Sequence, residues 1–398
     1  MVKTITILGA TGSIGTSTLD LIEREPDRFA VVALTANCDV ARLAAAALRT
    51  NAKFAVVADE SCLPELRAAL AGTNIGCGGG RAAVLEAASM GADITMGAIV
   101  GCTGLEPVMA AIAGGKTVIL ANKEPLVSAG EVVLAAAAKS GATLLPADSE
   151  HNAIFQCFDA ARPERVRRII LTCSGGPFRE WSTEQMRSVT PEQAVAHPNW
   201  SMGAKISVDS ATLFNKGLEL IEAARLFPVP NDAIEIVIHP QSVIHSLVDY
   251  VDGSVLAQMG PPDMRVPIAS CLAWPDRMAT PMAPLDLVAI GRLDFTAPDP
   301  VRFPALKLTR DALNAGGARP AILNAANEIA VAAFLAREIG FLEIAAIVAD
   351  TLEGYDPAAP ATLEDVLVVD AEARRMARRY VGSRGGAARG ANVKDISV

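Results

Sequence analysis

The chain has 398 residues, of which 51% are hydrophobic and 20% charged, and its formal net charge is −9. This composition is typical of a packed globular protein with two or three domains and excludes a disordered chain. The acidic balance excludes nucleic acid as a main partner, since binding a phosphate backbone requires a basic face. No apolar run approaches the ~18 residues of a membrane span, so we expect no membrane association. Seven cysteines without a C-x-x-C pair favour buried thiols in the reducing cytoplasm over disulfides or a zinc site.

The first predicted strand covers residues 4–8 and leads directly into a glycine turn from Gly9 to Gly15, with a helix over residues 17–24. Strand, glycine turn and helix are the context of a dinucleotide site, because glycines let backbone N–H groups approach a pyrophosphate. The spacing is G-x-x-G-x-x-G instead of G-x-G-x-x-G, and an ordinary turn is the alternative interpretation.

Further strands alternate with alanine-rich helices in the first 150 residues, which predicts a Rossmann-like, doubly wound parallel sheet of the α/β class. The predicted strands are 30–36, 54–59, 92–98, 117–122 and 143–148, and two of the helices are 40–49 and 131–139. Ligands of such sheets bind at the carboxyl ends of the strands. We therefore expect Gly12, Asn37, Asn122-Lys123-Glu124 and Asp148 on one rim.

The choice of dinucleotide is poorly encoded at the end of the second strand, Thr35-Ala36-Asn37-Cys38-Asp39. NAD enzymes often hold the ribose with an acidic residue at the end of this strand. Asp39 lies a few residues beyond the usual position of that acid. No arginine is found within that stretch to accept a 2′-phosphate. Either nicotinamide dinucleotide is physically possible.

An acidic stretch, Asp148-Ser149-Glu150, follows the short apolar run 143–147. If the strand continues, the two carboxylates face one side, and oxygen ligands of this kind suit Mg²⁺ or Mn²⁺. The commoner alternative is a helix start, with Ser149 as N-cap and Glu150 as a first-turn acid.

From residue 150 the pattern changes to α+β. A strand over 168–173 ends in Ser174-Gly175-Gly176-Pro177, which is either a backbone nest for an anion or an ordinary glycine turn. The segment 197–203 holds His197, Trp200 and Met202, and is either a lid over a ligand or a loop that buries its own tryptophan.

A helix is predicted over residues 209–227, capped by Asp209 or Ser210. Its polar side carries Asn215, Lys216, Glu219 and Glu222. In most amphipathic helices this side faces solvent. Gly217 in the interior costs about 1 kcal/mol relative to alanine, which indicates a close approach by another element.

Strands over 234–238, 242–250 and 255–259, with a hairpin at Asp252-Gly253, predict a mostly antiparallel sheet. Helices follow over 320–339, 342–352 and 362–380, the last capped by Thr362 and Asp365. We thus expect a nucleotide-binding domain (1–149), a catalytic α+β domain (150–273), a linker (274–304), a helical domain (305–381) and a disordered tail (382–398).

Several separate runs together resemble the 1-deoxy-D-xylulose 5-phosphate reductoisomerase family. They are GATGSIG (9–15), LANKE (120–124), DSEHNAIFQ (148–156), SGGPF (174–178), HPNWSMG (197–203), KISVDSAT (205–212), NKGLE (215–219), HPQSVIHS (239–246) and NAANEIAVAAFLA (324–336). The resemblance implies a cytoplasmic homodimer that uses NADPH and a divalent metal (Mn²⁺, Mg²⁺ or Co²⁺) to convert 1-deoxy-D-xylulose 5-phosphate, a phosphorylated ketose, to 2-C-methyl-D-erythritol 4-phosphate for isoprenoid synthesis.

The resemblance also implies roles for individual residues. Metal ligands and catalytic acids are Asp148, Glu150 and Glu219, and Lys123 is the catalytic cation. The substrate contacts are Lys123, Ser149, Glu150, Ser174, His197, Ser210, Asn215, Lys216 and Glu219. The NADPH contacts are Thr11, Gly12, Ser13, Ile14, Asn37, Asn122, Glu124 and Gly203.

One departure concerns the 2′-phosphate of NADPH. Many relatives carry Gly-Lys-Asn where this chain has Asn37-Cys38-Asp39, so the lysine is missing. We therefore expect a weaker preference for NADPH than in those relatives. Two other function classes remain as alternatives at this point, a metal-free NAD(P) dehydrogenase and a non-catalytic nucleotide sensor.

Overall fold

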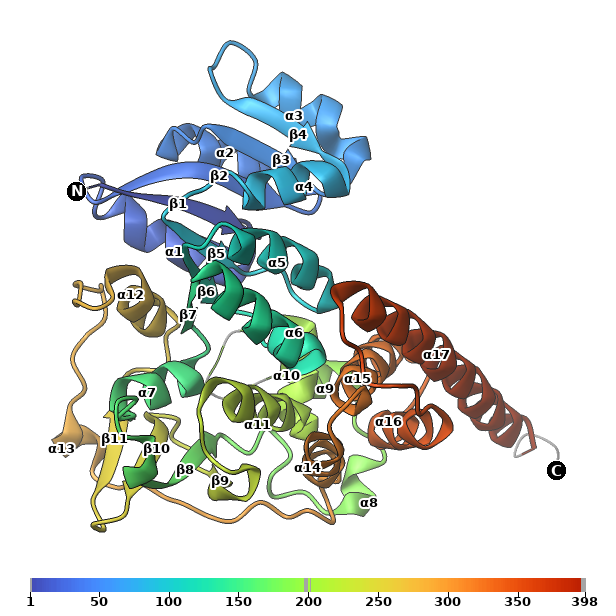
Figure 1. Ribbon diagram of the computed structural model, residues 1–398. Coiled ribbons are helices and arrows are strands. Elements are labelled where there is room, and N and C mark those ends of the chain that lie inside the picture. The colour runs from blue at the N-terminus through green and yellow to red at the C-terminus, as the bar shows by residue number, and fades with distance from the viewer. Residues whose placement is uncertain (1, 197–199, 201, 395–398) are drawn as a thin grey trace. The chain divides into compact units, whose positions relative to one another are not determined.

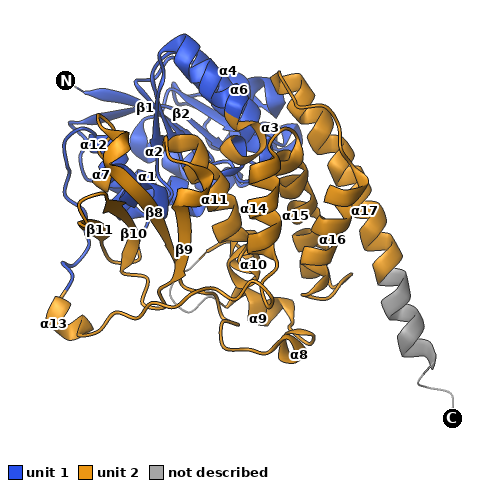
Figure 2. Cartoon of the chain, turned by 60° about the horizontal axis from the view of Figure 1, so that its bottom comes forward, with its two compact units in different colours: residues 1–125, 131–156, 263–285 blue, residues 126–130, 157–262, 286–398 orange. Residues whose placement is uncertain are grey.

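The computed structural model describes residues 2–196, 200 and 202–394, with side chains up to residue 384. The chain forms two compact units (Figure 2). Unit 1 comprises Met1–Pro125, Glu131–Gln156 and Asp263–Leu285, and unit 2 comprises Leu126–Gly130, Cys157–Pro262 and Asp286–Val398. None of the helices among the described residues combines the length and apolarity that a membrane crossing requires.

Unit 1 is built on a seven-stranded sheet in the order β4-β3-β2-β1-β5-β6-β7 (Figure 1). All its strand pairs are parallel, which confirms the predicted doubly wound α/β fold. The strands are β1 (Lys3–Leu8), β2 (Phe29–Ala36), β3 (Phe54–Val57), β4 (Gly76–Gly79), β5 (Ile94–Gly97), β6 (Thr117–Leu120) and β7 (Thr143–Pro146). The strand order reverses between β1 and β5, and ligands of this fold class bind at that point.

Helices and short 3₁₀ turns connect these strands. They are α1 (Ser13–Glu23), α2 (Val40–Thr50), η1 (Glu60–Cys62), α3 (Leu63–Ala69), α4 (Gly80–Ala88), η2 (Cys102–Gly104), α5 (Leu105–Ala113) and α6 (Glu124–Ser140). Helix α7 (Ser149–Cys157) follows the last strand, and α12 (Arg265–Ala273) comes later in the chain. The core combines apolar side chains of β1, β2, α1 and α2 with others from β3, β5, β6, β7, α3 and α12. Burial of these side chains is the main favourable contribution to the stability of the unit.

Strand β4 was not predicted, because its sequence Gly76-Cys77-Gly78-Gly79 has the residues least favoured in strands. The glycines are required by the neighbouring strand. A Cβ at Gly78 would lie 2.7 Å from the Phe54 ring. The phenylalanine of β3 therefore occupies the space that side chains of β4 would fill.

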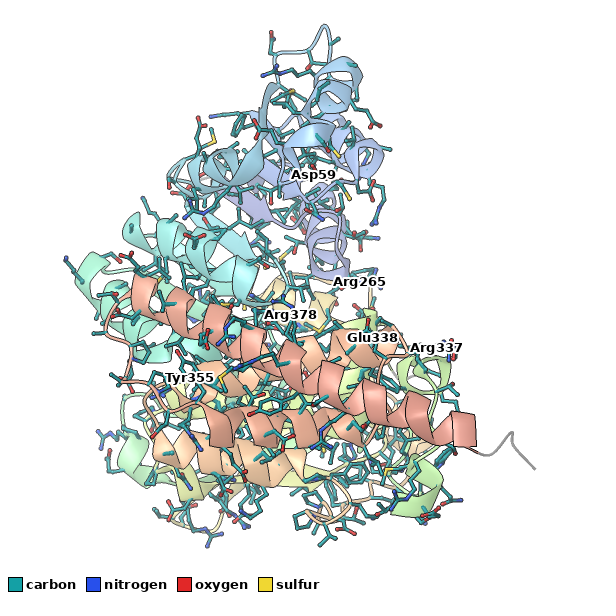
Figure 3. All side chains as sticks on the ribbon, turned by 90° about the vertical axis from the view of Figure 1, so that its right-hand side faces the viewer. Asp59, Arg265, Arg337, Glu338, Tyr355 and Arg378 are labelled. Carbon is teal, nitrogen blue, oxygen red and sulfur yellow. The ribbon has the colours of Figure 1, made fainter. Side chains whose placement is uncertain are left out.

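The predicted boundary at residues 149/150 is replaced by a division in which unit 1 also contains 150–156 and 263–285. Helix α12 belongs to unit 1 because Ile268 and Leu272 are buried in its core. Arg265, labelled in Figure 3, donates to Asp20 of α1 at 2.9 Å and to Asp263 at 2.9 Å. A return of the chain to an earlier core is a tertiary effect that local sequence patterns do not reveal.

Unit 2 contains a four-stranded sheet in the order β11-β10-β8-β9. Strand β10 (Ile244–Tyr250) pairs antiparallel with β8 (Val166–Cys173) and with β11 (Val255–Met259). Strand β9 (Ile234–Ile238) pairs parallel with β8. The predicted mostly antiparallel sheet and its hairpin are thus confirmed.

The helical part of unit 2 is centred on α15, which contacts α10, α14, α16 and α17. The helices and 3₁₀ turns of the unit are η3 (Pro163–Arg165), α8 (Thr183–Met186), α9 (Pro191–Val195), α10 (Ala204–Thr212), α11 (Phe214–Leu226), η4 (Asn231–Ala233), α13 (Leu287–Ile290), α14 (Ala305–Ala315), α15 (Arg319–Leu335), α16 (Glu343–Gly354) and α17 (Leu363–Lys394). The predicted cap of the last helix is present, since Thr362 Oγ1 accepts from the Asp365 N–H at 3.1 Å.

The predicted linker and the predicted disordered tail are both corrected by the structure. The expected linker 274–304 contains α13, and its Thr296 forms a bridge with Ile238 of β9. Helix α17 continues past residue 382, where we expected a disordered tail. Arg384 donates to Asp350 of α16 at 2.6 Å, and this tertiary ion pair stabilises the added turn.

The predicted single helix over 209–227 is two helices, α10 and α11. They are separated by Leu213, whose φ of 65° is in the left-handed region. This conformation costs a non-glycine residue about 1–3 kcal/mol and persists only where the surroundings impose it. The proposed caps Asp209 and Ser210 lie inside α10, whose N-cap is Gly203.

Gly217 permits the close contact between α11 and α14 that its position predicted. A Cβ there would lie 2.3 Å from Oγ1 of Thr309, which donates to the Ala305 carbonyl. We expect Gly217→Ala to lower the free energy of unfolding by about 1–3 kcal/mol, since overpacking outweighs the gain in helix propensity. Thermal unfolding of Gly217→Ala and of Gly217→Ala with Thr309→Ala measures this. Failure of the second change to restore stability would show that Thr309 is not the obstacle.

Candidate functional site

The glycine turn of unit 1 leads from β1 into α1 with two glycines that are sterically required. Gly9 has a φ of 90°, and a Cβ there would lie 2.6 Å from the Ala98 carbonyl oxygen. A Cβ at Gly15 would lie 2.3 Å from the Gly9 carbonyl oxygen. The turn is therefore closed tightly against β5 and α1, as at a dinucleotide site.

Gly12 is the N-cap of α1 and offers no side chain to the first turn. The backbone N–H groups at the start of a helix have no intrahelical acceptor, and the helix dipole favours an anion beside them. The Thr16 N–H, four residues after the N-cap, donates to the Gly12 carbonyl at 2.9 Å. The start of α1, with Thr11, Gly12, Ser13 and Ile14, can thus accept a phosphate group.

Other predicted cofactor contacts lie at the carboxyl ends of neighbouring strands of the same sheet. Asn37 directly follows β2 and is exposed. Asn122 follows β6, is buried and donates to the Gly101 carbonyl at 3.3 Å. Glu124 begins α6 and is also buried. The expected rim is thus confirmed in unit 1, whereas Gly203 is an exposed residue of unit 2.

Lys123 and Asp148, which end two adjacent strand–helix turns, form a buried ion pair with Nζ 2.8 Å from Oδ2. Burial by itself would raise the pKa of the Asp148 carboxyl. The Lys123 ammonium and the His151 ring overcome this and hold that pKa well below its usual range. Asp148 is therefore a carboxylate at neutral pH, with the Lys123 Nζ held beside it.

The acidic stretch is the start of a helix and not the end of a strand. Strand β7 ends at Pro146 and α7 begins at Ser149. Asp148 occupies the N-cap position, because its carbonyl accepts from the Asn152 N–H at 2.9 Å. The predicted N-cap is therefore shifted by one residue. Ser149 and Glu150 are hydrogen-bonded to each other in the first turn.

In unit 2 the first turns of α11 hold a second group of predicted residues. Lys216 and Glu219 are 2% and 1% exposed, although the helix pattern made solvent the expected neighbour. Lys216 donates to one oxygen of Glu219, and Asn215 donates to the other. Buried charges are stable only when paired in this way. The alternative of a solvated polar face is therefore excluded for Lys216 and Glu219.

The turn after β8 approaches the end of α10 within the same unit. Gly175 and Gly176 have φ values of 80° and 70°, and the Gly176 N–H donates to Ser174 Oγ at 3.1 Å. A Cβ at Gly176 would lie 2.8 Å from the carbonyl oxygen of Ser210. The structure thus places the backbone of Ser210 beside the turn that begins at Ser174.

Part of the loop with unusual composition lies outside the described residues, including His197. Trp200 is half-buried, and its ring centroid is 6.2 Å from that of His245. His239 is structural, since its ring nitrogens bond the Asp294 carbonyl at 3.0 Å and the Ile244 N–H at 3.3 Å. Trp200 thus lies against β10 within unit 2.

Sequence reasoning missed two sets of polar partners. His151 is fully buried, with Nδ1 3.7 Å from Asp148 Oδ1, and its spacing of three residues in a helix was the available signal. Asp209 is also buried and accepts from Lys205 and from Asn327 of α15, each at 2.8 Å. The Lys205–Asp209 spacing of four residues was readable, but the partner on α15 was not.

Family models and curated relatives of this chain name one family. Three family models match it: the 1-deoxy-D-xylulose 5-phosphate reductoisomerase model over residues 5–130, the C-terminal domain model of that enzyme over 144–227, and the DXP reductoisomerase C-terminal domain model over 259–376. The 1-deoxy-D-xylulose 5-phosphate reductoisomerase of Zymomonas mobilis is 62% identical over 381 residues, covering 96% of this chain and 98% of that protein. The one from Rhodospirillum centenum is 56% identical over 382 residues, covering 96% and 95%.

Solved structures give the same answer. The Zymomonas mobilis reductoisomerase in complex with NADPH has a TM-score of 0.92 and 59% identity, covering 96% of this chain and 99% of that one. A DOX-P reductoisomerase in complex with NADPH, fosmidomycin and magnesium has a TM-score of 0.91 and 43% identity, covering 96% and 98%. The chain belongs to the 1-deoxy-D-xylulose 5-phosphate reductoisomerase family.

Proposed function

We propose that this chain converts 1-deoxy-D-xylulose 5-phosphate to 2-C-methyl-D-erythritol 4-phosphate with NADPH and a divalent metal. The observation that carries the proposal is the buried Lys216–Glu219 pair at the start of α11. Burying two charges lowers the stability of the fold, so a buried pair of this kind is typical of a site that holds a ligand.

Three carboxylates, Asp148, Glu150 and Glu219, are the proposed metal ligands. Their donors are all oxygens, without thiolate or imidazole, and this set fits a hard cation such as Mg²⁺ or Mn²⁺. When bound, the metal supplies Lewis-acid polarisation of the ketone and NADPH supplies a hydride. The hydrogen bonds of Asn215 and Lys216 to Glu219 and the ion pair of Lys123 with Asp148 support the orientation of these carboxylates.

The phosphate end of the substrate is proposed to bind in unit 2. Asn215 and Lys216 lie in the first turn of α11, where backbone N–H groups and the helix dipole attract an anion. Ser174, Ser210 and His197 complete the proposed set. Remote binding of the phosphate positions the reacting carbons and contributes to the rate as well as to affinity.

The reacting end is proposed to lie beside Lys123 and Ser149. Lys123 remains protonated next to the Asp148 carboxylate and stabilises negative charge that develops on the substrate oxygens. The Ser149 hydroxyl, Glu150 and Glu219 orient the substrate hydroxyls by hydrogen bonding. The loop containing Trp200 is proposed to close over the substrate and exclude water.

The test follows NADPH oxidation at 340 nm with 1-deoxy-D-xylulose 5-phosphate after complete chelation of divalent metal. We expect the chelated protein to be inactive and Mg²⁺ or Mn²⁺ to restore turnover, because the ketone is otherwise unpolarised. Full activity after chelation would identify a metal-free dehydrogenase. Binding of NADPH without oxidation under any metal condition would identify a nucleotide sensor.

The assembly and location are also proposals. We propose a homodimer, for which the edge strand β11 is a candidate surface, since Val255 and Leu256 are exposed. Light scattering of the purified chain measures its mass, and a monomer at micromolar concentration would contradict this. Cys38, Cys62, Cys77 and Cys271 are free thiols, which supports a reducing compartment, the cytoplasm.

A further inference from the structure

The end of β2 lacks the lysine that many relatives place near the 2′-phosphate, but a different cation lies there. Arg42 is the third residue of α2 (Val40–Thr50), one turn beyond Asn37-Cys38-Asp39. Its Nη2 donates to Thr16 Oγ1 at 3.0 Å, and Thr16 Oγ1 donates to the Gly12 carbonyl at 2.8 Å. The guanidinium is thus connected to the glycine turn through a single hydroxyl.

This position has a defined meaning in a doubly wound fold. The pyrophosphate binds at the N-terminus of the first helix, and the adenosine ribose lies beyond the end of the second strand. A group that contacts α1 near Gly12 and also begins α2 lies between those two places. Arginine suits a phosphate there because it is always charged and donates two parallel hydrogen bonds.

The nearby carboxylate does not oppose this assignment. Asp39 accepts from the Arg42 backbone N–H at 3.1 Å and thereby caps α2. Its Oδ2 also lies 3.5 Å from Arg42 Nη1. The charge of Asp39 is therefore partly neutralised, and the carboxylate is committed to the helix start instead of to a ribose hydroxyl.

We propose that Arg42 is the residue that selects NADPH over NADH in this protein, by binding the 2′-phosphate in place of the missing lysine. The proposal rests on the proposed use of NADPH. It replaces the expectation of a weakened preference, which assumed that no cation was present beyond β2. In the absence of cofactor, Thr16 and Asp39 hold the guanidinium near the position that the phosphate takes.

The experiment measures binding of 2′,5′-ADP and of 5′-AMP by titration calorimetry, so that no turnover is needed. We expect Arg42→Ala to weaken 2′,5′-ADP binding about 10- to 100-fold, the usual range for a charged hydrogen bond, while 5′-AMP binding stays within about twofold. NADPH and NADH, followed by fluorescence, should show the same difference. Raising the salt concentration should weaken 2′,5′-ADP binding to the wild type more than to Arg42→Ala.

Arg49→Ala is the matched control. Arg49 lies on the same helix, is similarly exposed (54% against 59% for Arg42) and pairs with Glu23 of α1 at 3.1 Å. It lies in the last turn, away from the glycine turn, so its removal should leave both ligands unaffected. Cys38→Lys in the Arg42→Ala background should regain 2′,5′-ADP binding, since it returns a cation to the same place.

Each other outcome overturns the proposal in a distinguishable way. Equal weakening of both nucleotides by Arg42→Ala would mean that Arg42 shapes the adenosine site as a whole. Unchanged selectivity in Arg42→Ala would mean that another group reads the 2′-phosphate, with NADPH use intact. A wild type that binds 2′,5′-ADP and 5′-AMP equally, and NADPH no better than NADH, would overturn the proposed cofactor as well.

Discussion

Glu219→Gln should abolish turnover while leaving NADPH binding intact. The substitution keeps the size of the side chain but removes the negative charge that the proposed metal site needs. We expect kcat to fall by at least about 10²- to 10³-fold, the range found when one preorganised electrostatic group is lost. NADPH affinity, measured by fluorescence, should change less than about twofold, because the proposed cofactor residues other than Gly203 lie in unit 1.

Loss of a buried charge also affects stability, so a control must separate the two effects. Glu328→Gln removes the charge of a largely buried glutamate of α15 in the same unit. Its Oε2 lies 2.5 Å from Nη2 of Arg374. It should lower the unfolding temperature without a comparable fall in kcat. If Glu219→Gln retains turnover near the wild-type rate, or if Glu328→Gln is equally inactive while folded, the three-carboxylate site is wrong.

Lys123→Met should reduce both catalysis and stability. The Lys123 ammonium is buried, 2.8 Å from Asp148, and methionine preserves most of its shape without the charge. Removing one partner of a buried pair costs up to about 3–5 kcal/mol, and Asp148 would keep only the His151 ring, with Nδ1 at 3.7 Å, beside its charge. We expect a fall in kcat of about 10²- to 10³-fold from the lost stabilisation of developing oxyanion charge.

The pH dependence of this stability loss follows from Asp148. Its pKa is lowered in the folded protein, so the ion pair stabilises the fold above the unfolded pKa of about 4. That contribution is lost as the pH falls through the lowered folded value. The difference in unfolding temperature between wild type and Lys123→Met should be constant from pH 7 to about pH 5 and should narrow only at more acidic pH.

Lys116→Met is the surface control for this comparison. Lys116 is 53% exposed and lies 3.8 Å from Asp93. An exposed pair of this kind contributes about 0–1 kcal/mol, so the unfolding temperature should hardly change. If Lys123→Met lowers the unfolding temperature no more than Lys116→Met does, the Asp148 carboxylate is not stabilised by Lys123.

The elements that sequence patterns predicted well are those with strong local signals. Residues 3–23 have the periodicity and composition of a strand, a glycine turn and a helix, although α1 begins at Ser13, earlier than expected. Strands β10 and β11 are joined by an Asp-Gly turn. Strand β4 failed because its glycines make sense only against the ring of Phe54. Neither composition nor period carries that information.

The candidate site shows the same division. The carboxylates of Asp148 and Glu150 indicated oxygen ligands, and the runs 148–156 and 215–219 indicated the family and, through it, Glu219. Local reasoning by itself favoured caps and a solvated helix face. Lys216 and Glu219 are buried on a helix that begins after the left-handed turn at Leu213 and packs through Gly217 against Thr309. These are contacts between α10, α11 and α14, and no window of sequence contains all three.

The amino-acid sequence by itself determined the class of the fold, the order of most elements, the family and the chemical types of the candidate ligands, because these depend on local periodicity and on motifs. The tertiary structure alone decided that α12 joins the first unit, that Lys123 holds the Asp148 carboxylate ionised, and that Arg42 lies next to the glycine turn. Each of these depends on a contact between residues distant in the chain, and the energy of such a contact depends on burial and distance, which only the folded chain defines.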